Sequence, residues 1–177
     1  GITGEGLVNR NLNLVGSGAT LLHSADAGAS WQPRPVASDA SFFDLDCPDP
    51  ARCLAVGSDG TIAHSDNGGL DWTVNRQQPG QSLSAVACSG DTCLAGAWAD
   101  NFATATPLLR SLDGGSSWTV LADPPFSRLI LALHCLDDGA CWLGGILVDR
   151  AWQRRGIGRR AVRAALDMLA DRHGHRR

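Results

Sequence analysis

The stretch of residues 149–160 has the composition of a phosphate-binding loop. It is DRAWQRRGIGRR, with five arginines and two glycines separated by a single residue. Glycines let backbone amides approach an anionic ligand closely, and the arginines add positive charge. A short apolar strand over 146–148 precedes the loop, and apolar residues at helical spacing over 162–169 predict an amphipathic helix after it. The positive end of this helix would favour a phosphate group further.

The six cysteines are a second group of residues that could do chemistry, and they form three local pairs. Each pair brackets a predicted hairpin turn, with four or five residues between its cysteines. Zinc sites use tighter spacing, and each pair lies in its own repeat, so we assign no metal site. We predict disulfides, which form outside the cytosol. The pairs are Cys47 with Cys53, Cys88 with Cys93, and Cys135 with Cys141.

Three segments share a serine, an Asp or Asn, a glycine and a terminal tryptophan. They are SADAGASW at 24–31, SDNGGLDW at 65–72 and SLDGGSSW at 111–118, and we call them the box segments. The Asp or Asn and the serine can bond turn amides, the glycine permits a positive φ, and the tryptophan can pack on a neighbouring unit. We interpret all these residues as structural: Ser24, Asp26, Gly28, Trp31; Ser65, Asn67, Gly69, Trp72; Ser111, Asp113, Gly115, Trp118.

The elements that carry these residues repeat along the chain. The box tryptophans are 41 and then 46 residues apart, and each cysteine pair joins the end of one apolar strand to the start of the next. About four short strands fit in each repeat, and 21 glycines supply many tight turns. The predicted fold is mainly β, with incomplete repeats over 1–145 and a separate strand, loop and helix over 146–177.

The box segments resemble the Asp-box, or BNR, repeat of sialidases, sortilin-type receptors and photosystem II assembly and stability factors. The resemblance covers about residues 7–145, and the cysteine pairs are most similar to those of secreted bacterial propellers of the assembly-factor type. It implies a partial β-propeller of about three four-stranded blades, and the apolar spacing over 162–169 predicts one C-terminal amphipathic α-helix after it. Because propellers close with four to eight blades, we expect exposed blade edges that favour oligomers.

The segment 146–173 resembles the acetyl-CoA motif of the GNAT N-acetyltransferases, which is Gln or Arg, two residues, Gly, one residue, and Gly or Ala. Gln153, Gly156 and Gly158 match, whereas Arg150 stands where the family often has proline. The resemblance implies that this segment binds the pyrophosphate and pantetheine of acetyl-CoA. We assign no catalytic residue. The implied cofactor-binding residues are Val148, Gln153, Arg154, Arg155, Gly156, Ile157, Gly158 and Arg159.

Charge divides the chain at the same place. Residues 1–148 hold six arginines and fifteen acidic residues, whereas 149–177 hold nine arginines and three aspartates. The basic part could contact nucleic acid, but the linked acidic part argues against that partner. No apolar run is long enough for a membrane span. His23 and His64 precede two box segments, and we interpret both as blade surface.

Three functions are compatible with these features. The first is a noncatalytic propeller fragment that binds a protein partner or scaffolds assembly, and its disulfides would place it outside the cytoplasm. The second is a GNAT fusion or fragment that binds acetyl-CoA, which would be cytoplasmic. The third is a sialidase-type glycosidase, which we rank last because that chemistry commonly uses a tyrosine nucleophile and the chain has no tyrosine.

Overall fold

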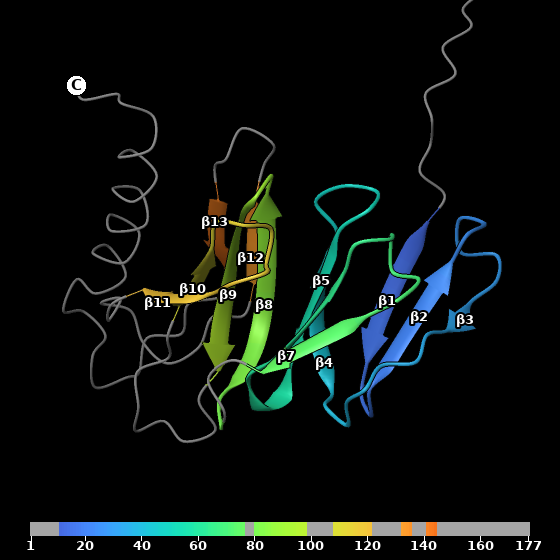
Figure 1. Ribbon diagram of the computed structural model, residues 1–177, viewed down its shortest axis with the longest axis horizontal. Helices are drawn as coiled ribbons and strands as arrows, with labels where there is room; N and C mark the ends of the chain where they lie inside the picture. The colour runs from blue at the N-terminus through green and yellow to red at the C-terminus, as the bar shows by residue number, and fades with distance from the viewer. Residues whose placement is uncertain (1–10, 77–79, 99–107, 122–131, 136–140, 145–177) are drawn as a thin grey trace, which may run out of the picture.

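A computed structural model of the chain describes residues 11–76, 80–98, 108–121, 132–135 and 141–144. The regular elements of this part are strands and one short 3₁₀ turn (Figure 1). They are β1 (Leu12–Gly16), β2 (Thr20–Ser24), β3 (Gln32–Pro33), β4 (Phe42–Asp46), β5 (Cys53–Gly57), η1 (Ser58–Gly60), β6 (Thr61–Ser65), β7 (Thr73–Arg76), β8 (Ser82–Ser89), β9 (Thr92–Trp98), β10 (Leu108–Ser111), β11 (Thr119–Leu121), β12 (Ala132–Cys135) and β13 (Cys141–Gly144).

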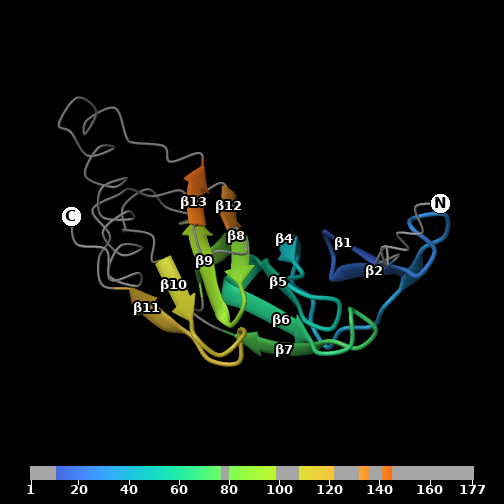
Figure 2. The same ribbon diagram turned by 90° about the horizontal axis from the view of Figure 1, so that it is seen from above.

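These strands form four antiparallel sheets in chain order, which we number as blades. Blade 1 is β1-β2-β3, blade 2 is β4-β5-β6-β7, blade 3 is β8-β9-β10-β11, and blade 4 is β12-β13. The sheets stand side by side along an arc, with β4, β8 and β12 on its inner side and β7 and β11 on its outer side (Figure 2). We call β4, β8 and β12 the inner strands. This arrangement is a partial propeller, as the repeats predict. The predicted C-terminal helix and the predicted domain over 146–177 lie outside the described residues.

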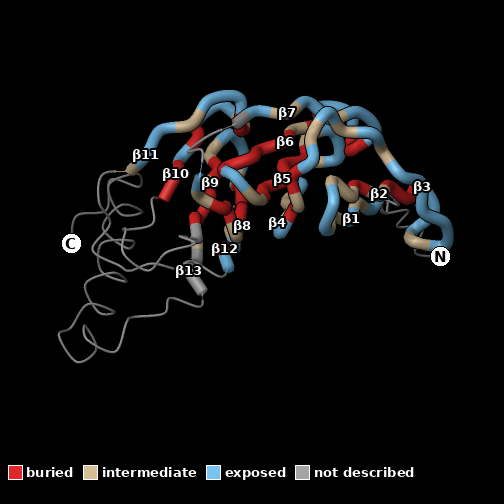
Figure 3. Tube along the Cα trace, turned by 90° about the horizontal axis from the view of Figure 1, so that it is seen from below, coloured by how far each residue is buried: buried red, intermediate tan, exposed pale blue. Residues whose placement is uncertain are grey.

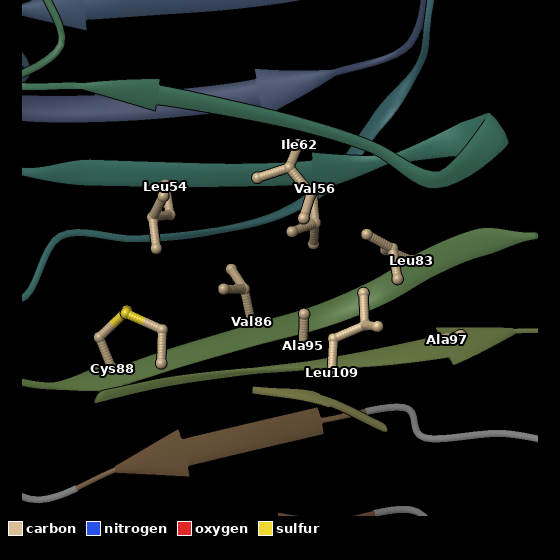
Figure 4. Close-up of a cluster of buried hydrophobic side chains, with 10 residues drawn as sticks. Leu54, Val56, Ile62, Leu83, Val86, Cys88, Ala95, Ala97 and Leu109 are labelled. Atoms are coloured by element: carbon tan, nitrogen blue, oxygen red, sulfur yellow. A yellow bond between two sulfur atoms is a disulfide. The ribbon is translucent and has the colours of Figure 1, made fainter. Parts of the chain in front are cut away.

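The hydrophobic core lies between neighbouring blades. Figure 3 shows the buried residues along the strands and the exposed residues at the loops and outer strands. Between blades 2 and 3, Leu54, Val56 and Ile62 pack against Leu83 and Leu109 (Figure 4). Each sheet must bury both faces in this way, so that each blade depends on its neighbours for stability. A second cluster joins blades 1 and 2, and a third joins blades 3 and 4.

Each predicted cysteine pair is joined by a disulfide. The bridges are Cys47–Cys53, Cys88–Cys93 and Cys135–Cys141, with Cα–Cα distances of 4.1, 4.0 and 4.0 Å. Each one links the first two strands of a blade across their connecting turn, where the antiparallel register places the cysteines opposite each other in blades 3 and 4. The loops are short, so each bridge restricts the unfolded chain less than a long-range bridge would.

Among the residues that the structure describes, no helix is long and apolar enough to cross a membrane.

Candidate functional site

The box segments are turns closed by their own side chains. In each one the serine hydroxyl accepts the amide N–H of the glycine four residues later, at 2.8 Å for Gly28, 2.9 Å for Gly69 and 2.8 Å for Gly115. One side-chain oxygen of Asp26, Asn67 or Asp113 then accepts an amide N–H from the residue four positions further along. These bonds satisfy the turn amides locally, so the box side chains are occupied in holding the turn.

The box glycines of blades 2 and 3 are also contact points between blades. Gly69 and Gly115 have φ of +91° and +96°, which side chains other than hydrogen resist. A Cβ at Gly69 would lie 2.0 Å from Asn13 Oδ1 of blade 1, and a Cβ at Gly115 would lie 2.5 Å from Leu54 Cδ2 of blade 2. Strand β1 of blade 1 and strand β5 of blade 2 therefore each pack directly on the box segment of the next blade.

Asp26 and Asp113 are held in the charged form by their turns. Hydrogen bonds from Ser30 and Ser24 lower the pKa of Asp26 to about 2, and bonds from Ser117 and Ser111 lower the pKa of Asp113 to about 2. A carboxylate with a depressed pKa stabilises the folded state above its unfolded pKa of 3.8, and that contribution disappears as the pH falls towards 2. The two turns should therefore weaken in acid.

Replacing both aspartates with asparagine should reduce this acid sensitivity. Asn67 in blade 2 already accepts the same amide bond at 2.9 Å, so asparagine can hold the turn without a titrating group. We expect the Asp26→Asn, Asp113→Asn double variant to resemble the parent chain at neutral pH and to lose less unfolding free energy between pH 3.8 and pH 2. Urea unfolding across that pH range measures the unfolding free energy of the parent and of the double variant. An equal loss of unfolding free energy in the two proteins would contradict the expectation.

His23 is not a blade-surface residue, and that prediction is wrong. Its side chain is buried, and its Nδ1 lies 3.0 Å from Asn13 Oδ1. Burial lowers its pKa, and the charge of Arg34 lowers it further. The Nδ2 of Asn13 in turn donates to the carbonyl of Gly68 at 3.1 Å. His23 therefore supports the junction between blades 1 and 2.

The cysteine turns and box segments lie together at one rim of the blades. The amide of Gly68 donates to Ala51 O at 2.6 Å, and the amide of Gly114 donates to Asp91 O at 2.9 Å, so each box segment bonds the cysteine turn of its own blade. Arg52 connects the rims of two blades, because it pairs with Asp49 at 2.6 Å and with Asp91 at 2.5 Å. Both partners are at the surface, so these bonds position the rim more than they stabilise it.

Two carboxylates on the first inner strand make a different kind of junction. Asp44 Oδ2 accepts the amide N–H of Val86 at 2.8 Å, and Asp46 Oδ2 accepts the amide N–H of Cys88 at 2.6 Å. We call Asp44 and Asp46 the inner carboxylate pair. Both amides belong to β8, the inner strand of blade 3, and lie 42 residues from their acceptors. The pair therefore bonds the free edge of one inner strand from the neighbouring blade.

Burial raises the pKa of both carboxyl groups, although the amide bonds act in the opposite direction. The charge of Asp44 raises the pKa of Asp46 further, whereas that of His134 on β12 opposes the rise. Charged side chains from the inner strands β4 and β12 thus both act on the carboxyl group of Asp46. Asp44 and Asp46 were not among the residues predicted from the sequence. The repeat contained a signal for them. The equivalent positions of β8 are occupied by Ala85 and Ala87, so the two aspartates depart from the pattern of the next repeat.

A bulge places Phe43 beside this pair. The register of β4 shifts between Phe42 and Asp44, and the register of β8 shifts at the corresponding place, between Leu83 and Ala85. A bulge re-aims the extra side chain out of the ordinary alternation. Phe43 is 46% exposed there, whereas the corresponding bulge residue of β8 is Ser84. The inner strands therefore offer an exposed aromatic ring next to two carboxylates.

The cofactor-binding residues implied by the sequence, from Val148 to Arg159, lie outside the described residues. Among the described residues, no group of three or more His, Cys, Asp or Glu side chains is arranged to hold a metal ion. The box residues are distributed over the rims of three blades and are not gathered at one centre.

The C-terminal part of the chain matches a known protein family. The sequence model of the acetyltransferase (GNAT) family matches residues 79–177, which is more than half of the chain. The chain belongs to the acetyltransferase (GNAT) family. The GNAT match begins within the repeats, where the described residues form blades 3 and 4. There, Ala85, Ala87, Leu108 and Leu133 are buried between the blades.

The repeats have a separate relationship to propeller proteins. The photosystem II assembly protein Ycf48 of Synechococcus sp. (strain JA-2-3B'a(2-13)) is 32% identical over 121 residues, covering 66% of this chain and 34% of that protein. The chain thus spans about a third of the length of this relative.

Solved structures show the same fold. A structure of YCF48 bound to D1 peptide has a TM-score of 0.51 at 24% identity and covers 64% of this chain and 36% of that one. An ancestral GH74 enzyme has a TM-score of 0.63 at 15% identity and covers 76% of this chain and 20% of that one. At these identities the likeness shows the propeller fold alone.

Proposed function

We propose that the repeats form a noncatalytic β-propeller module that binds a peptide segment of a protein partner. The observation that carries this proposal is the 32% identity to an assembly protein, Ycf48, whose structural counterpart has been solved with a bound peptide. The box serines and aspartates are engaged in their own turns, which supports a structural role for them. The Asp-box resemblance is consistent with such a scaffold.

The inner strands are the surface that we propose for the peptide. Phe43 supplies an exposed aromatic ring, and aromatic side chains are enriched in the cores of binding interfaces. It stands on a rigid two-blade junction, because the inner carboxylate pair bonds β4 to β8 directly beside it. Rigid support lowers the entropy that binding must overcome. A peptide with an apolar residue to pack on Phe43 fits this surface.

A peptide library displayed on phage tests the proposal with the full chain as the target. Peptides that are selected should lose at least about 30-fold in affinity on Phe43→Ser, because an anchor side chain contributes about 2 kcal/mol or more. Serine occupies the corresponding bulge of β8, so this change suits the backbone. Val120→Ser on the outer strand β11, where the side chain is equally exposed, is the control and should leave affinity unchanged. Peptides that bind Phe43→Ser normally would contradict the proposal, as would a selection that enriches none.

The three disulfides support a location for the propeller outside the cytosol. Disulfides persist in oxidising compartments and are rare where glutathione keeps thiols reduced. We therefore propose that the propeller module folds in an extracytoplasmic compartment or is secreted.

A second candidate function is acetyl-CoA binding by the C-terminal segment. The GNAT family match over 79–177 favours it, and the contacts that the resemblance implies lie within residues 148–159. Acetyl-CoA would supply the activated acetyl group. The glycines at 156 and 158 would admit its pyrophosphate to the backbone amides.

Calorimetric titration of the full chain with acetyl-CoA tests this second candidate. We expect saturable binding that Gly156→Asp weakens at least about tenfold, because the added side chain and charge would exclude and repel the pyrophosphate. Gly174→Asp makes the same replacement in the same segment but outside the motif, and it should bind normally. An absence of binding at millimolar acetyl-CoA would contradict the candidate, and so would equal binding by the two variants.

A further inference from the structure

The box segment of blade 2 contains the dipeptide Asn67-Gly68, whereas the boxes of blades 1 and 3 have an aspartate in place of the asparagine. Asparagine followed by glycine is chemically labile, because the nitrogen of a residue without a Cβ reaches the side-chain amide carbon with little hindrance. Gly68 has a φ of +73°, and a Cβ there would lie 2.8 Å from the carbonyl oxygen of Pro50 in the cysteine turn. The fold therefore requires a glycine directly after Asn67.

The polar pair that closes this box is reversed relative to the other two boxes. In blades 1 and 3 the aspartate accepts a hydrogen bond from a serine hydroxyl four residues later, at 2.7 Å from Ser30 and 2.5 Å from Ser117. In blade 2 the donor comes first, because Nδ2 of Asn67 donates to Oδ2 of Asp71 at 2.8 Å. Conversion of the Asn67 amide to a carboxylate would remove this donor. It would also leave two carboxylates facing each other, which is unfavourable.

The folded box protects both groups that would react. The N–H of Gly68 donates to the carbonyl of Ala51 at 2.6 Å, and Gly68 is buried. Oδ1 of Asn67 accepts the hydroxyl of Ser65 at 2.9 Å and the amide N–H of Asp71 at 2.9 Å. The Gly68 nitrogen must lose its proton before it can attack, and the Asn67 side chain must rotate out of these bonds. The reaction therefore requires the box to open.

Blade 1 lies against this box and holds it closed. Nδ2 of Asn13 donates to the carbonyl of Gly68 at 3.1 Å, and a Cβ at Gly69 would lie 2.0 Å from Oδ1 of Asn13. The ring of His23 fixes Asn13 from the other side at 3.0 Å. Because the Asn13 bond must break when the box opens, opening of the box also loosens the junction between blades 1 and 2.

We propose that Asn67 is a deamidation site and that the junction between blades 1 and 2 sets the rate of its reaction. When the box opens, the Gly68 nitrogen loses its proton to solvent and bonds to Cγ of Asn67. The side-chain nitrogen takes up a proton and leaves as ammonia, and water then opens the succinimide ring to give aspartate or isoaspartate. Aspartate puts a carboxylate opposite that of Asp71, and isoaspartate lengthens the turn backbone by a carbon atom. Either product opposes closure of the box, so a junction that has opened stays loosened.

Peptide mapping by mass spectrometry tests the site on the full chain, which is incubated at mildly alkaline pH with its disulfides intact. Cleavage after Arg52 and Arg76 isolates Asn67 and Asn75 in the same peptide. Asn67 should convert in urea, and at least about tenfold more slowly in the folded chain, because opening of the box limits the reaction there. Asn75 precedes an arginine, so it is the matched control and should stay intact. An unreacted Asn67 in urea overturns the site, and equal rates in the two states overturn the role of the junction.

The variant Asn13→Ala tests the contact with blade 1 directly. It should accelerate conversion of Asn67 in the folded chain at least about threefold and leave the rate in urea unchanged. Amide exchange in the parent chain provides a second measurement that needs no variant. Low urea concentrations should accelerate exchange at Gly68 and deamidation at Asn67 by the same factor. An unchanged rate in folded Asn13→Ala overturns the proposal, and so does deamidation that does not follow the exchange of Gly68.

The effect of the product is tested by urea unfolding of the aspartate variant. Asn67→Asp should lower the folding equilibrium constant at least about fivefold at neutral pH, a modest factor because both side chains of the pair are exposed. Adding Asp71→Ser recreates the aspartate–serine pair of blades 1 and 3, so the double variant should regain the parent value. Asp71→Ser alone is the control and should resemble the parent chain. An Asn67→Asp variant as stable as the parent overturns this effect, as does a double variant no more stable than Asn67→Asp.

Discussion

Replacing Gly115 with alanine is expected to lower the free energy of unfolding by about 3 kcal/mol or more, the largest single-residue effect that we predict. Two costs combine in this variant. A φ of +96° is unfavourable for alanine, with a cost on the order of 1 to 3 kcal/mol, and the new Cβ would lie 2.5 Å from Leu54 Cδ2. Overpacking of this kind adds about 1 to 3 kcal/mol when the neighbours cannot move. Urea unfolding with the disulfides intact measures the total.

Gly80→Ala separates the two costs. Gly80 has a φ of +80°, and a Cβ there would have no atom within 4 Å, so this variant should show the backbone cost without the clash. Adding Leu54→Ala to Gly115→Ala should remove most of the clash, because the leucine methyl groups are the atoms that the new Cβ meets. The double variant should then be less destabilised than the sum of the two single variants. Strict additivity would show that the box glycine is not a contact point between blades.

The second large effect is expected at the inner carboxylate pair. Replacing Asp44 and Asp46 with alanine leaves the amides of Val86 and Cys88 without their acceptors in the junction between blades 2 and 3. A buried N–H that loses its partner costs about 1 to 3 kcal/mol. Removing two partly buried carboxylates offsets part of this cost, so the double alanine variant should lose on the order of 3 kcal/mol of unfolding free energy. Asparagine keeps an acceptor oxygen in each position. The Asp44→Asn, Asp46→Asn variant should therefore be close to the parent chain in unfolding free energy at acidic pH.

The pH dependence distinguishes these variants further. Because burial raises the folded pKa of both carboxyl groups above 3.8, the folded state binds their protons more tightly than the unfolded state does. Their contribution to stability is therefore greatest below pH 3.8 and declines as the pH rises through the raised folded values. The asparagine variant lacks this decline. Its unfolding free energy should therefore increase relative to that of the parent chain as the pH rises through this range. Urea unfolding at a series of pH values tests this, and a constant difference would contradict it.

Much of the fold could be predicted from sequence because its signals are local. The cysteine pairs bracket single hairpin turns, and the box bonds join residues that are four positions apart. Such contacts depend on the turn itself, so repeated residue types at repeated spacing were sufficient to predict them. Counting the three boxes predicted about three blades, and the structure adds the two strands of blade 4. His23 was misjudged because its neighbours in sequence are ordinary strand residues, while its burial comes from its place in the junction with blade 2.

The sequence by itself determined the repeat, the disulfide pairing and the mainly β class, since each depends on contacts within one hairpin or one turn. Only the tertiary structure decided which residues join the blades. The amides that Asp44 and Asp46 bond are 42 residues away, and Leu54 meets Gly115 only when blades 2 and 3 stack. The physical reason is that a carboxylate or a leucine on a strand has the same local appearance whether it faces water or a neighbouring blade. The stacking of the sheets along the arc determines which of these it meets.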